Sequence, residues 1–270
     1  MKKIGLIFLA AIMIITLSGC QSKKTSATSS TTKAETSVDK IKKAGKIVVG
    51  TEATFPPFES VDTKDGKTIV GFDMDISQAV ADKLGVKLEV KDMKFDSLVE
   101  AVKTGMIDFT AAGMNPTADR AKVVDFSQVY FNTKQVLVIK DSNTSVNSAA
   151  DLSGKTLGAQ LGTTSEKAAK TISGVKQVKT MDKVDELMLE VKSGRLDGVV
   201  VENVVAGNYL KVGGLKIVNV PELNTDGDLG IAIAVKKGDA DLLKVINDTI
   251  VELKSNGQYD KLLEKWGMSK

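Results

Sequence analysis

The order of apolar and polar positions predicts alternating strands and helices from residue 46 onward. In "KIVVG" the apolar run Ile47–Val49 predicts a short strand that ends in a Gly-Thr turn. In "GFDMDISQAVADKLG" apolar residues recur at helical spacing, with aspartates near the start and Gly85 at the end. Aspartate suits the positive end of a helix dipole, and glycine suits the left-handed residue that ends a helix. We therefore expect a helix there, followed by a strand at "VKLEV", where apolar and polar residues alternate.

The next segments continue the same order of elements. "SLVEAVKT" predicts a second helix, which Gly105 ends, and "IDFTAAG" predicts a buried strand. Strand, helix, strand and helix in succession are typical of an α/β protein with a parallel sheet.

A short phrase occurs twice in the chain. "VKTGMID" at 102–108 returns as "VKSGRLD" at 191–197, which is 89 positions later (191 − 102). That distance is too long for a solenoid repeat of about 20–50 residues. Each copy covers the end of a predicted helix, its glycine and the start of a strand. Each half also has a Gly-Thr turn after its first strand, so the repeat predicts two related lobes rather than a chance match.

The last part of the chain is too small for a third domain. "GDLGIAIAVKKGD" predicts one strand, and "DLLKVINDTIVELKSNG" and "YDKLLEKWG" predict two helices. We expect these elements to return to the first lobe, so that the chain crosses twice between the lobes. The expected ranges are 39–131 with 226–270 for lobe 1, 135–222 for lobe 2, and 132–135 with 222–227 for the hinge crossings.

This organisation predicts where a ligand binds. In open α/β sheets ligands bind beyond the carboxyl ends of the strands. The expected fold class is therefore α/β, with two lobes, a two-strand hinge and a ligand cleft between the lobes.

The first 20 residues, "MKKIGLIFLAAIMIITLSGC", have a different composition. Two lysines precede an apolar run at Ile4–Leu17, which is typical of a secretory signal and short for a membrane-spanning helix. The ending "LSGC" resembles the lipobox of bacterial lipoproteins. That resemblance implies removal of residues 1–19 and attachment of lipid, including palmitate, to Cys20. The alternative is an ordinary signal peptide with an incidental cysteine.

The segment after Cys20 predicts a tether. Gln21–Val38 is rich in Ser, Thr and Lys and has few apolar residues to bury. We expect residues 20–38 to tie the folded part to the outer face of a cell membrane through the lipid anchor, in a Gram-positive bacterium.

The composition excludes several classes of function. Without residues 1–19, the 37 basic residues become 35 (37 − 2) against 34 acidic ones, so nothing favours nucleic acid as a partner. The single Cys leaves no disulfide framework. The absence of His removes the commonest metal ligand and excludes Ser-His and Cys-His chemistry. We expect no metal and no cofactor.

Five segments of the sequence stand out as motifs: "GTEATFPPFE", "GFDMDISQAVADKL", "FDSLVEAVKTGMIDFTAAGMNPTADRAKVVDFSQVYF", "GTTSE" and "RLDGVVVEN". As a set they resemble family 3 of the extracellular solute-binding proteins, the amino-acid-binding subunits of ABC importers. The resemblance covers Lys46 to Gly267. It implies the type II periplasmic-binding-protein fold and a monomer that closes on a free L-amino acid. It also implies delivery of that amino acid to the transmembrane subunits of an ABC permease and their ATPase.

The resemblance also implies a site for the ligand's main-chain groups. Arg120, in "PTADR", matches the arginine that binds the α-carboxylate, for which a guanidinium fork is suited. Thr164 matches a backbone N–H donor to the same carboxylate at a helix N-terminus. Gly113 and Asn115 match positions that bind main-chain groups, although the family more often has Ser or Thr at the latter. Glu202 matches the acid that pairs with the α-ammonium, where Asp is more common.

The positions that surround the ligand's side chain match Glu52, Phe55 and Phe95. Aromatic faces attract alkyl-ammonium and guanidinium groups, and a buried carboxylate is best satisfied by a cation. These residues favour arginine, lysine or ornithine, with a neutral polar amino acid such as glutamine as the alternative. Gln160 either lines this pocket or stands at a strand edge.

Two other functions fit the same fold. One is an enzyme similar to cyclohexadienyl dehydratases, in which Glu52 or Glu202 would serve as general acid. The other is a ligand sensor for a separate membrane receptor. The lipobox and the amino-acid clamp favour a binding protein over both.

Overall fold

The computed structural model describes residues 35–224 and 229–269. The expected signal peptide, Cys20 and most of the expected tether lie outside the described residues. Helix α1 (Ser37–Ala44) begins inside the range expected for the tether, and Thr36 caps it by accepting from the backbone N–H of Asp39. None of the described helices is long and apolar enough to cross a bilayer.

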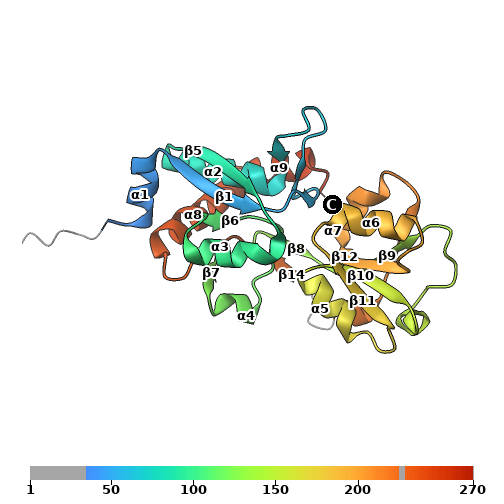
Figure 1. The fold of residues 1–270 in the computed structure, drawn as a ribbon. Helices are drawn as coiled ribbons and strands as arrows, with labels where there is room; N and C mark the ends of the chain where they lie inside the picture. Colours follow the sequence, from blue (N-terminus) through green and yellow to red (C-terminus); the bar gives the residue numbers. More distant parts are fainter. Residues whose placement is uncertain (1–34, 225–228, 270) are drawn as a thin grey trace, which may run out of the picture. The chain divides into compact units, whose positions relative to one another are not determined.

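The first lobe is built on a five-stranded sheet with the order β5-β1-β6-β15-β7 (Figure 1). Strand β1 runs parallel to β5 and β6, whereas β15 runs antiparallel to β6 and β7. A small antiparallel sheet, β2-β3-β4, adjoins it. The strands are β1 (Lys46–Thr51), β2 (Thr54–Phe55), β3 (Glu59–Val61), β4 (Ile69–Val70), β5 (Lys87–Asp92), β6 (Phe109–Thr110), β7 (Val124–Phe126) and β15 (Ala234–Lys236).

Helices α2 (Phe72–Leu84) and α3 (Leu98–Thr104) form where the apolar spacing predicts them. Gly85 and Gly105 end them in the left-handed conformation, as expected. The buried face of α2 includes Ile76, Val80 and Leu84, which are three of the residues at the predicted spacing. The short helix α4 (Ala118–Ala121) follows, with Thr117 as its N-cap.

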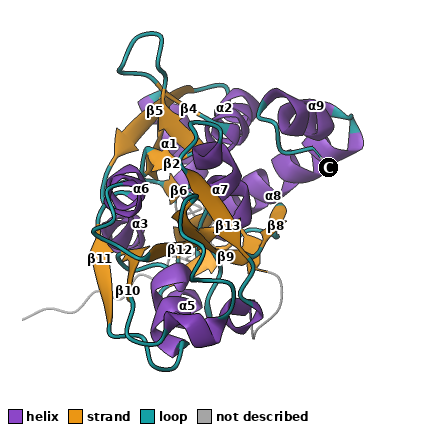
Figure 2. Cartoon of the chain, turned by 90° about the vertical axis from the view of Figure 1, so that its right-hand side faces the viewer, coloured by secondary structure: helices purple, strands orange, loops and turns teal. Residues whose placement is uncertain are grey.

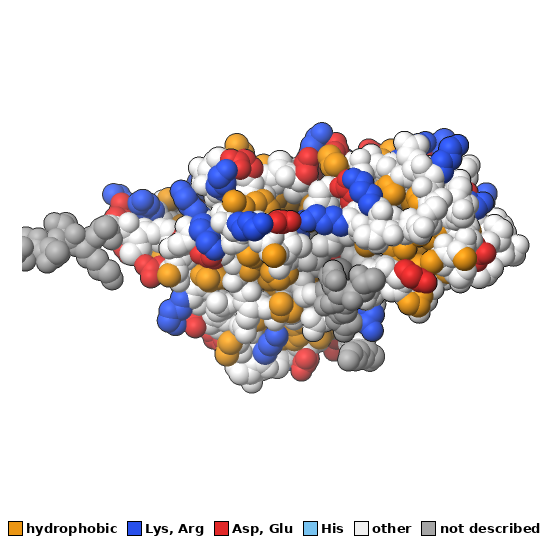
Figure 3. Space-filling model, turned by 90° about the horizontal axis from the view of Figure 1, so that it is seen from below, with side chains coloured by type: hydrophobic (Ala, Val, Ile, Leu, Met, Phe, Trp, Pro, Cys, Tyr) orange, Lys and Arg blue, Asp and Glu red, His pale blue; other side chains and the backbone are white. Residues whose placement is uncertain are grey.

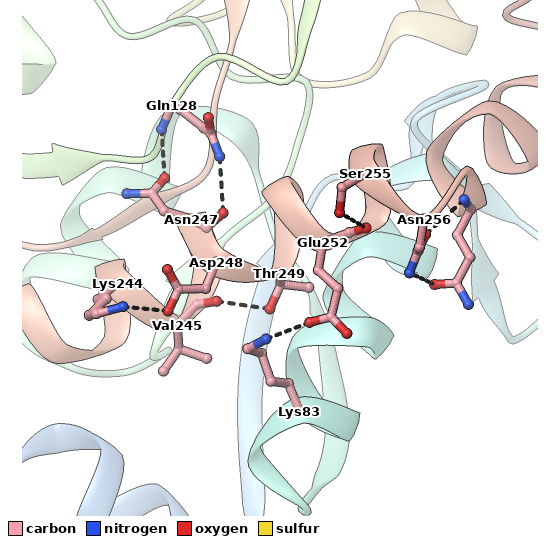
Figure 4. A network of polar contacts seen from close by, with 11 residues as sticks. Lys83, Gln128, Lys244, Val245, Asn247, Asp248, Thr249, Glu252, Ser255 and Asn256 are labelled. Atoms are coloured by element: carbon pink, nitrogen blue, oxygen red, sulfur yellow. Dashed lines mark hydrogen bonds and ion pairs between the residues drawn. The ribbon is translucent and has the colours of Figure 1, made fainter.

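The C-terminal elements pack with the elements of the first lobe. Strand β15 lies inside its sheet, and helices α8 (Ala240–Ser255) and α9 (Gln258–Lys265) pack beside α2. Polar contacts hold α8 in place (Figure 4): Lys83 Nζ lies 2.6 Å from Glu252 Oε2, and the backbone N–H of Gln128 donates to Asn247 Oδ1 at 2.8 Å.

The second lobe is built on the sheet β11-β10-β12-β9-β13. Helix α5 covers one face, and α6 and α7 cover the other (Figures 1 and 2). The strands are β9 (Gln135–Lys140), β10 (Thr156–Gln160), β11 (Gln177–Met181), β12 (Gly198–Glu202) and β13 (Leu215–Val218). The helices are α5 (Thr164–Thr171), α6 (Val184–Lys192) and α7 (Asn203–Leu210), with 3₁₀ turns η2 (Ala149–Leu152) and η3 (Pro221–Asn224). In the first lobe, η1 (Phe95–Ser97) precedes α3.

Two paired strands connect the lobes. Strand β8 (Phe131–Thr133) runs antiparallel to β14 (Leu229–Ile231). The first overlaps the expected crossing at 132–135 in residues 132–133. The second begins at Leu229, after the expected range 222–227, of which 225–227 lies outside the described residues. The part 222–224 belongs to η3, which packs on β9 and α5 of lobe 2.

The repeated phrase forms the same unit in both lobes. Its last residue, Asp108 or Asp197, accepts through its side chain from a backbone N–H of a parallel strand of the same lobe: Val48 in β1 at 2.7 Å, or Thr156 in β10 at 2.8 Å. In return, the backbone N–H of each aspartate donates to the carbonyl of that same residue at 2.9 Å. The prediction of two related lobes is confirmed.

Acidic and basic side chains are interspersed on the face shown in Figure 3. Neither charge forms a continuous stripe there, as the nearly neutral balance of the expected mature chain suggests.

Candidate functional site

Hydrogen bonds between the two lobes show that they are closed on each other. Gln160 Nε2 donates to Glu52 Oε2 at 2.7 Å, and Arg120 Nη2 donates to the carbonyl oxygen of Gly162 at 2.8 Å. An ion pair, Lys94 Nζ to Asp182 Oδ2 at 2.6 Å, also joins the lobes.

A cavity lies at the carboxyl ends of strands of both sheets. Its lining comes from both lobes and comprises Phe55, Phe95, Gly113, Asn115, Gln160, Thr163, Thr164, Ser165, Val184, Leu187, Val199, Val200, Val201 and Glu202. Glu52 and Arg120 stand directly behind this lining, since they hydrogen-bond to Gln160 and to the backbone of Asn115.

Glu52 is a buried carboxylate that is held from both lobes. It follows β1 and is 4% exposed. Thr54 Oγ1 lies 2.9 Å from one carboxylate oxygen and 2.8 Å from the other, and Gln160 contacts the second oxygen. Burial, together with the negative charges of Asp92 and Asp185, raises the pKa of Glu52 to about 7 against the effect of these donors. A nearby cation would relieve both effects.

Two buried phenylalanines border the cavity. The guanidinium of Arg120 lies over the ring of Phe95, which is in η1. Its distance from the ring centroid is 5.1 Å, within the range of a cation–π contact. Phe55 stacks on Phe58, with ring centroids 5.9 Å apart. Gly113 must be glycine, because its φ is +54° and a Cβ there would lie 2.6 Å from the Phe55 ring.

Arg120 reaches from lobe 1 to lobe 2. It lies in α4 and donates through Nη1 to the carbonyl of Asn115 at 2.8 Å, in addition to its contact with Gly162. Burial lowers the pKa of Arg120 to about 10, and the charge of Glu202 opposes that shift. The guanidinium is therefore positive at neutral pH and lies next to the start of α5.

Asn115 and Thr164 meet across the cleft. Thr164 Oγ1 donates to Asn115 Oδ1 at 2.6 Å, and Asn115 Nδ2 donates to the carbonyl of Gly230 in β14 at 3.0 Å. Thr164 is the first residue of α5, whose N-cap is Thr163. The first backbone N–H groups of a helix attract an anion, so this end of the cavity suits a carboxylate.

Glu202 ends β12 and is 2% exposed. Its Oε2 is buried and has no hydrogen-bond partner among the described residues. Burial raises the pKa of Glu202 to about 8, while hydrogen bonding by Asn115 and the charge of Arg120 act to lower it. A buried acceptor without a partner is unfavourable by about 1–3 kcal/mol, which a donor from a ligand would remove.

The sequence patterns did not reveal some of the polar residues around the cavity. Gln135, at the start of β9, is buried and bonds to the start of α5: Nε2 donates to Thr164 Oγ1 at 3.2 Å, and Oε1 accepts from Ser165 Oγ at 2.8 Å. No motif marks Gln135. Thr163 and Ser165 lie in "GTTSE", so that motif could have indicated them.

The family model for bacterial extracellular solute-binding proteins, family 3, matches residues 47–269. The arginine-binding extracellular protein ArtP of Bacillus subtilis is 36% identical over 269 residues, which cover 98% of each chain. The L-arginine-binding protein of Pseudomonas aeruginosa is 35% identical over 228 residues, covering 81% of this chain and 86% of its own.

Solved structures show the same fold. The substrate-binding protein of an amino acid ABC transporter superposes with a TM-score of 0.78 at 48% identity and covers 82% of this chain and 98% of its own. An ancestral arginine-binding protein, solved with arginine and with glutamine, is 46% identical, with TM-scores of 0.75 and 0.77. These two structures cover 82% and 83% of this chain, and 98% and 99% of their own.

One further structure bears on enzyme activity. An ancestral amino-acid-binding protein described as a precursor of cyclohexadienyl dehydratase is 36% identical, with a TM-score of 0.79, and covers 85% of this chain and 98% of its own.

The extent of the family match and of these similarities leads to one conclusion. This chain belongs to family 3 of the bacterial extracellular solute-binding proteins.

Proposed function

We propose that this protein captures a basic L-amino acid, namely arginine, lysine or ornithine, outside the cell and delivers it to an ABC transporter. One observation carries the choice of ligand. The cleft buries two carboxylates, Glu52 and Glu202, beside one guanidinium, that of Arg120.

These three side chains together carry one net negative charge when both carboxylates are ionised. A basic amino acid carries two positive groups and one negative group, so each of its charges finds an opposite one. The α-carboxylate meets Arg120 and the first N–H groups of α5, the α-ammonium meets Glu202, and the side-chain cation lies toward Glu52. Unpaired buried charges are strongly unfavourable, so this pairing favours net positive ligands.

Glutamine is the main alternative ligand, since its amide could donate to Glu52. It would leave one of the two carboxylates without a cationic partner. The similar ancestral protein that has been solved with both arginine and glutamine makes this a ligand that must be tested.

Closure of the lobes links capture to delivery. Arg120 and Glu52 are on lobe 1, and Glu202 and the start of α5 are on lobe 2, so only the closed state offers the ligand all its contacts. We expect the loaded, closed monomer to dock on the transmembrane subunits of the permease. Attachment through a lipidated Cys20 would hold it at the outer face of the cell membrane, because two acyl chains suffice for stable anchoring.

The alternatives of an enzyme or a sensor predict different results. A dehydratase would use Glu52 or Glu202 as general acid, and a pKa between about 7 and 8 suits that role. We favour binding because Oε1 and Oε2 of Glu52 are already held by Thr54 and Gln160 of the chain itself.

A calorimetric titration tests the proposal. Residues 35–270, which form one compact unit, are unfolded and refolded to remove bound ligand, then titrated with the twenty amino acids and ornithine. The expected result is tight binding confined to arginine, lysine or ornithine. Tight binding of a neutral amino acid alone would contradict the ligand class. No binding together with turnover of prephenate or arogenate would support an enzyme instead.

A further inference from the structure

We infer that Tyr209 of lobe 2 is a positioning residue that holds the lobes closed by donating to Thr54 of lobe 1, and so controls how fast the ligand leaves. This inference rests on the proposed binding function. The hydroxyl of Tyr209 donates to the carbonyl oxygen of Thr54 at 2.8 Å. The two residues stand on different lobes, one near the end of α7 and the other in β2.

A second hydrogen bond joins Thr54 to the same lobe. The backbone N–H of Val184 donates to Thr54 Oγ1 at 3.0 Å. Val184 is the first residue of α6, and its N-cap residue, Lys183, makes no capping hydrogen bond with its side chain. The first N–H groups of a helix lack partners within the helix. A residue of lobe 1 therefore caps the first N–H of α6, whereas Asp185 of the helix itself accepts from the N–H of Glu186.

The Thr54 hydroxyl connects this cap to the proposed ligand side-chain pocket. A hydroxyl has one hydrogen to donate and can accept from other groups. Thr54 Oγ1 lies within hydrogen-bonding distance of both Glu52 oxygens and accepts from Val184. One side chain thus fixes the buried carboxylate of lobe 1 and docks the start of α6. When the lobes separate, α6 loses its cap and Tyr209 loses its acceptor.

Tyr209 is suited to a test because it acts on closure without lining the cavity. Val184 contributes to the cavity wall, whereas Tyr209 does not. Removal of its hydroxyl should therefore destabilise the closed state to the same extent for each ligand. The expected change is a rise of the dissociation rate constant by about two- to tenfold, which is the effect of one ordinary hydrogen bond. The preference among ligands should not change.

The test compares Tyr209→Phe with Tyr259→Phe in the refolded protein. Tyr259 is a matched control, because its hydroxyl also donates to a backbone carbonyl, that of Tyr130, but within lobe 1. Stopped-flow measurements give association and dissociation rate constants for the two amino acids that bind most tightly in the titration. Thermal unfolding without ligand reports the stability of the fold.

The expected result is faster dissociation for Tyr209→Phe than for both the wild type and Tyr259→Phe. Dissociation of the two ligands should rise by the same factor. Dissociation equal to that of the wild type would overturn the inference, and so would a change in the ratio of the two affinities. Thr54→Val removes the hydroxyl that accepts from Val184 and should also release the ligand faster. If the titration identifies a neutral ligand, the proposed ligand class fails while this comparison still holds.

Discussion

Gln160 Nε2 lies 2.7 Å from Glu52 Oε2, so an amide of one lobe holds the buried carboxylate of the other. The same Nε2 also lies 2.9 Å from the carbonyl oxygen of Asp182. Glu52 is therefore fully positioned only when the lobes are closed. Recognition of the ligand's charge and closure of the lobes therefore depend on the same atoms.

The first prediction concerns the carboxylate end of the ligand. Arg120→Ala should weaken binding of the preferred amino acid by about 2–5 kcal/mol, because it leaves a buried carboxylate without its partner. Arg120→Lys retains the charge but not the planar fork, so it should recover only part of the loss. Calorimetry gives both values. An affinity of Arg120→Ala within threefold of the wild type would contradict this role.

The second prediction concerns selectivity. Glu52→Gln removes one negative charge with little change in shape. Binding of arginine should weaken by about 1.5–3 kcal/mol, the value of a hydrogen bond to a charged group. Glutamine should lose much less. The ratio of the dissociation constants for arginine and glutamine, measured in one buffer, tests this prediction. A ratio unchanged from the wild type would show that Glu52 does not distinguish a charged ligand side chain from a neutral one.

The third prediction concerns proton release. Burial raises the pKa of Glu52 to about 7 and that of Glu202 to about 8, so both are partly protonated near neutrality. A cationic ligand binds the ionised forms and must displace these protons. Affinity should therefore rise as the pH increases from about 6 to about 8.5. Titrations in buffers of different ionisation enthalpy should detect released protons, and an affinity independent of pH would contradict the account.

The fourth prediction concerns a buried pair next to the site. Glu59 and Asp73 are fully buried; Asp73 accepts from Tyr130 Oη at 2.6 Å and from the backbone N–H of Gly113 at 2.9 Å. Burial raises the pKa of Asp73 to about 6 and that of Glu59 well above its ordinary value, to which the charge of Asp73 adds. Both groups thus stay protonated in the folded chain at a pH where the unfolded chain ionises.

The sign of the resulting pH dependence follows from the raised pKa values. The two carboxyl groups contribute their full stabilisation below about pH 4, the pKa that they have in the unfolded chain. This contribution is lost as the pH rises through the pKa values that they have in the folded chain. Without ligand, the free energy of unfolding should fall by about 1–3 kcal/mol between about pH 4.5 and pH 8. Glu59→Gln removes one of the two titrations and should flatten the curve. Denaturant unfolding at several pH values measures this, and identical curves for the two proteins would contradict it.

The sequence predicted the local elements well because each has a local cause. Helix α2 has its apolar spacing and its terminal Gly85, and the repeated phrase ends in an aspartate that bonds to β1 in lobe 1 and to β10 in lobe 2. No local sequence pattern indicates the contacts between the lobes. Thr54 and Val184 are separated by 130 positions, and their hydrogen bond depends on closure rather than on either neighbourhood.

The same reason explains why the sequence did not indicate Gln135 as a residue of the site. Its side chain bonds to the start of α5 from a neighbouring strand, and nothing in the surrounding residues distinguishes it from an ordinary strand glutamine. The proposed ligand-contacting residues, by contrast, stand in the motifs that carry the family resemblance.

The most direct test of the central claim compares arginine with citrulline, which has nearly the same shape but no side-chain charge. Both are titrated into the refolded protein at one pH and one salt concentration. The account predicts that arginine binds at least about tenfold more tightly, because only arginine pairs a cation with Glu52. Equal affinities, or tighter binding of citrulline, would contradict the proposal that this cleft selects a positive charge.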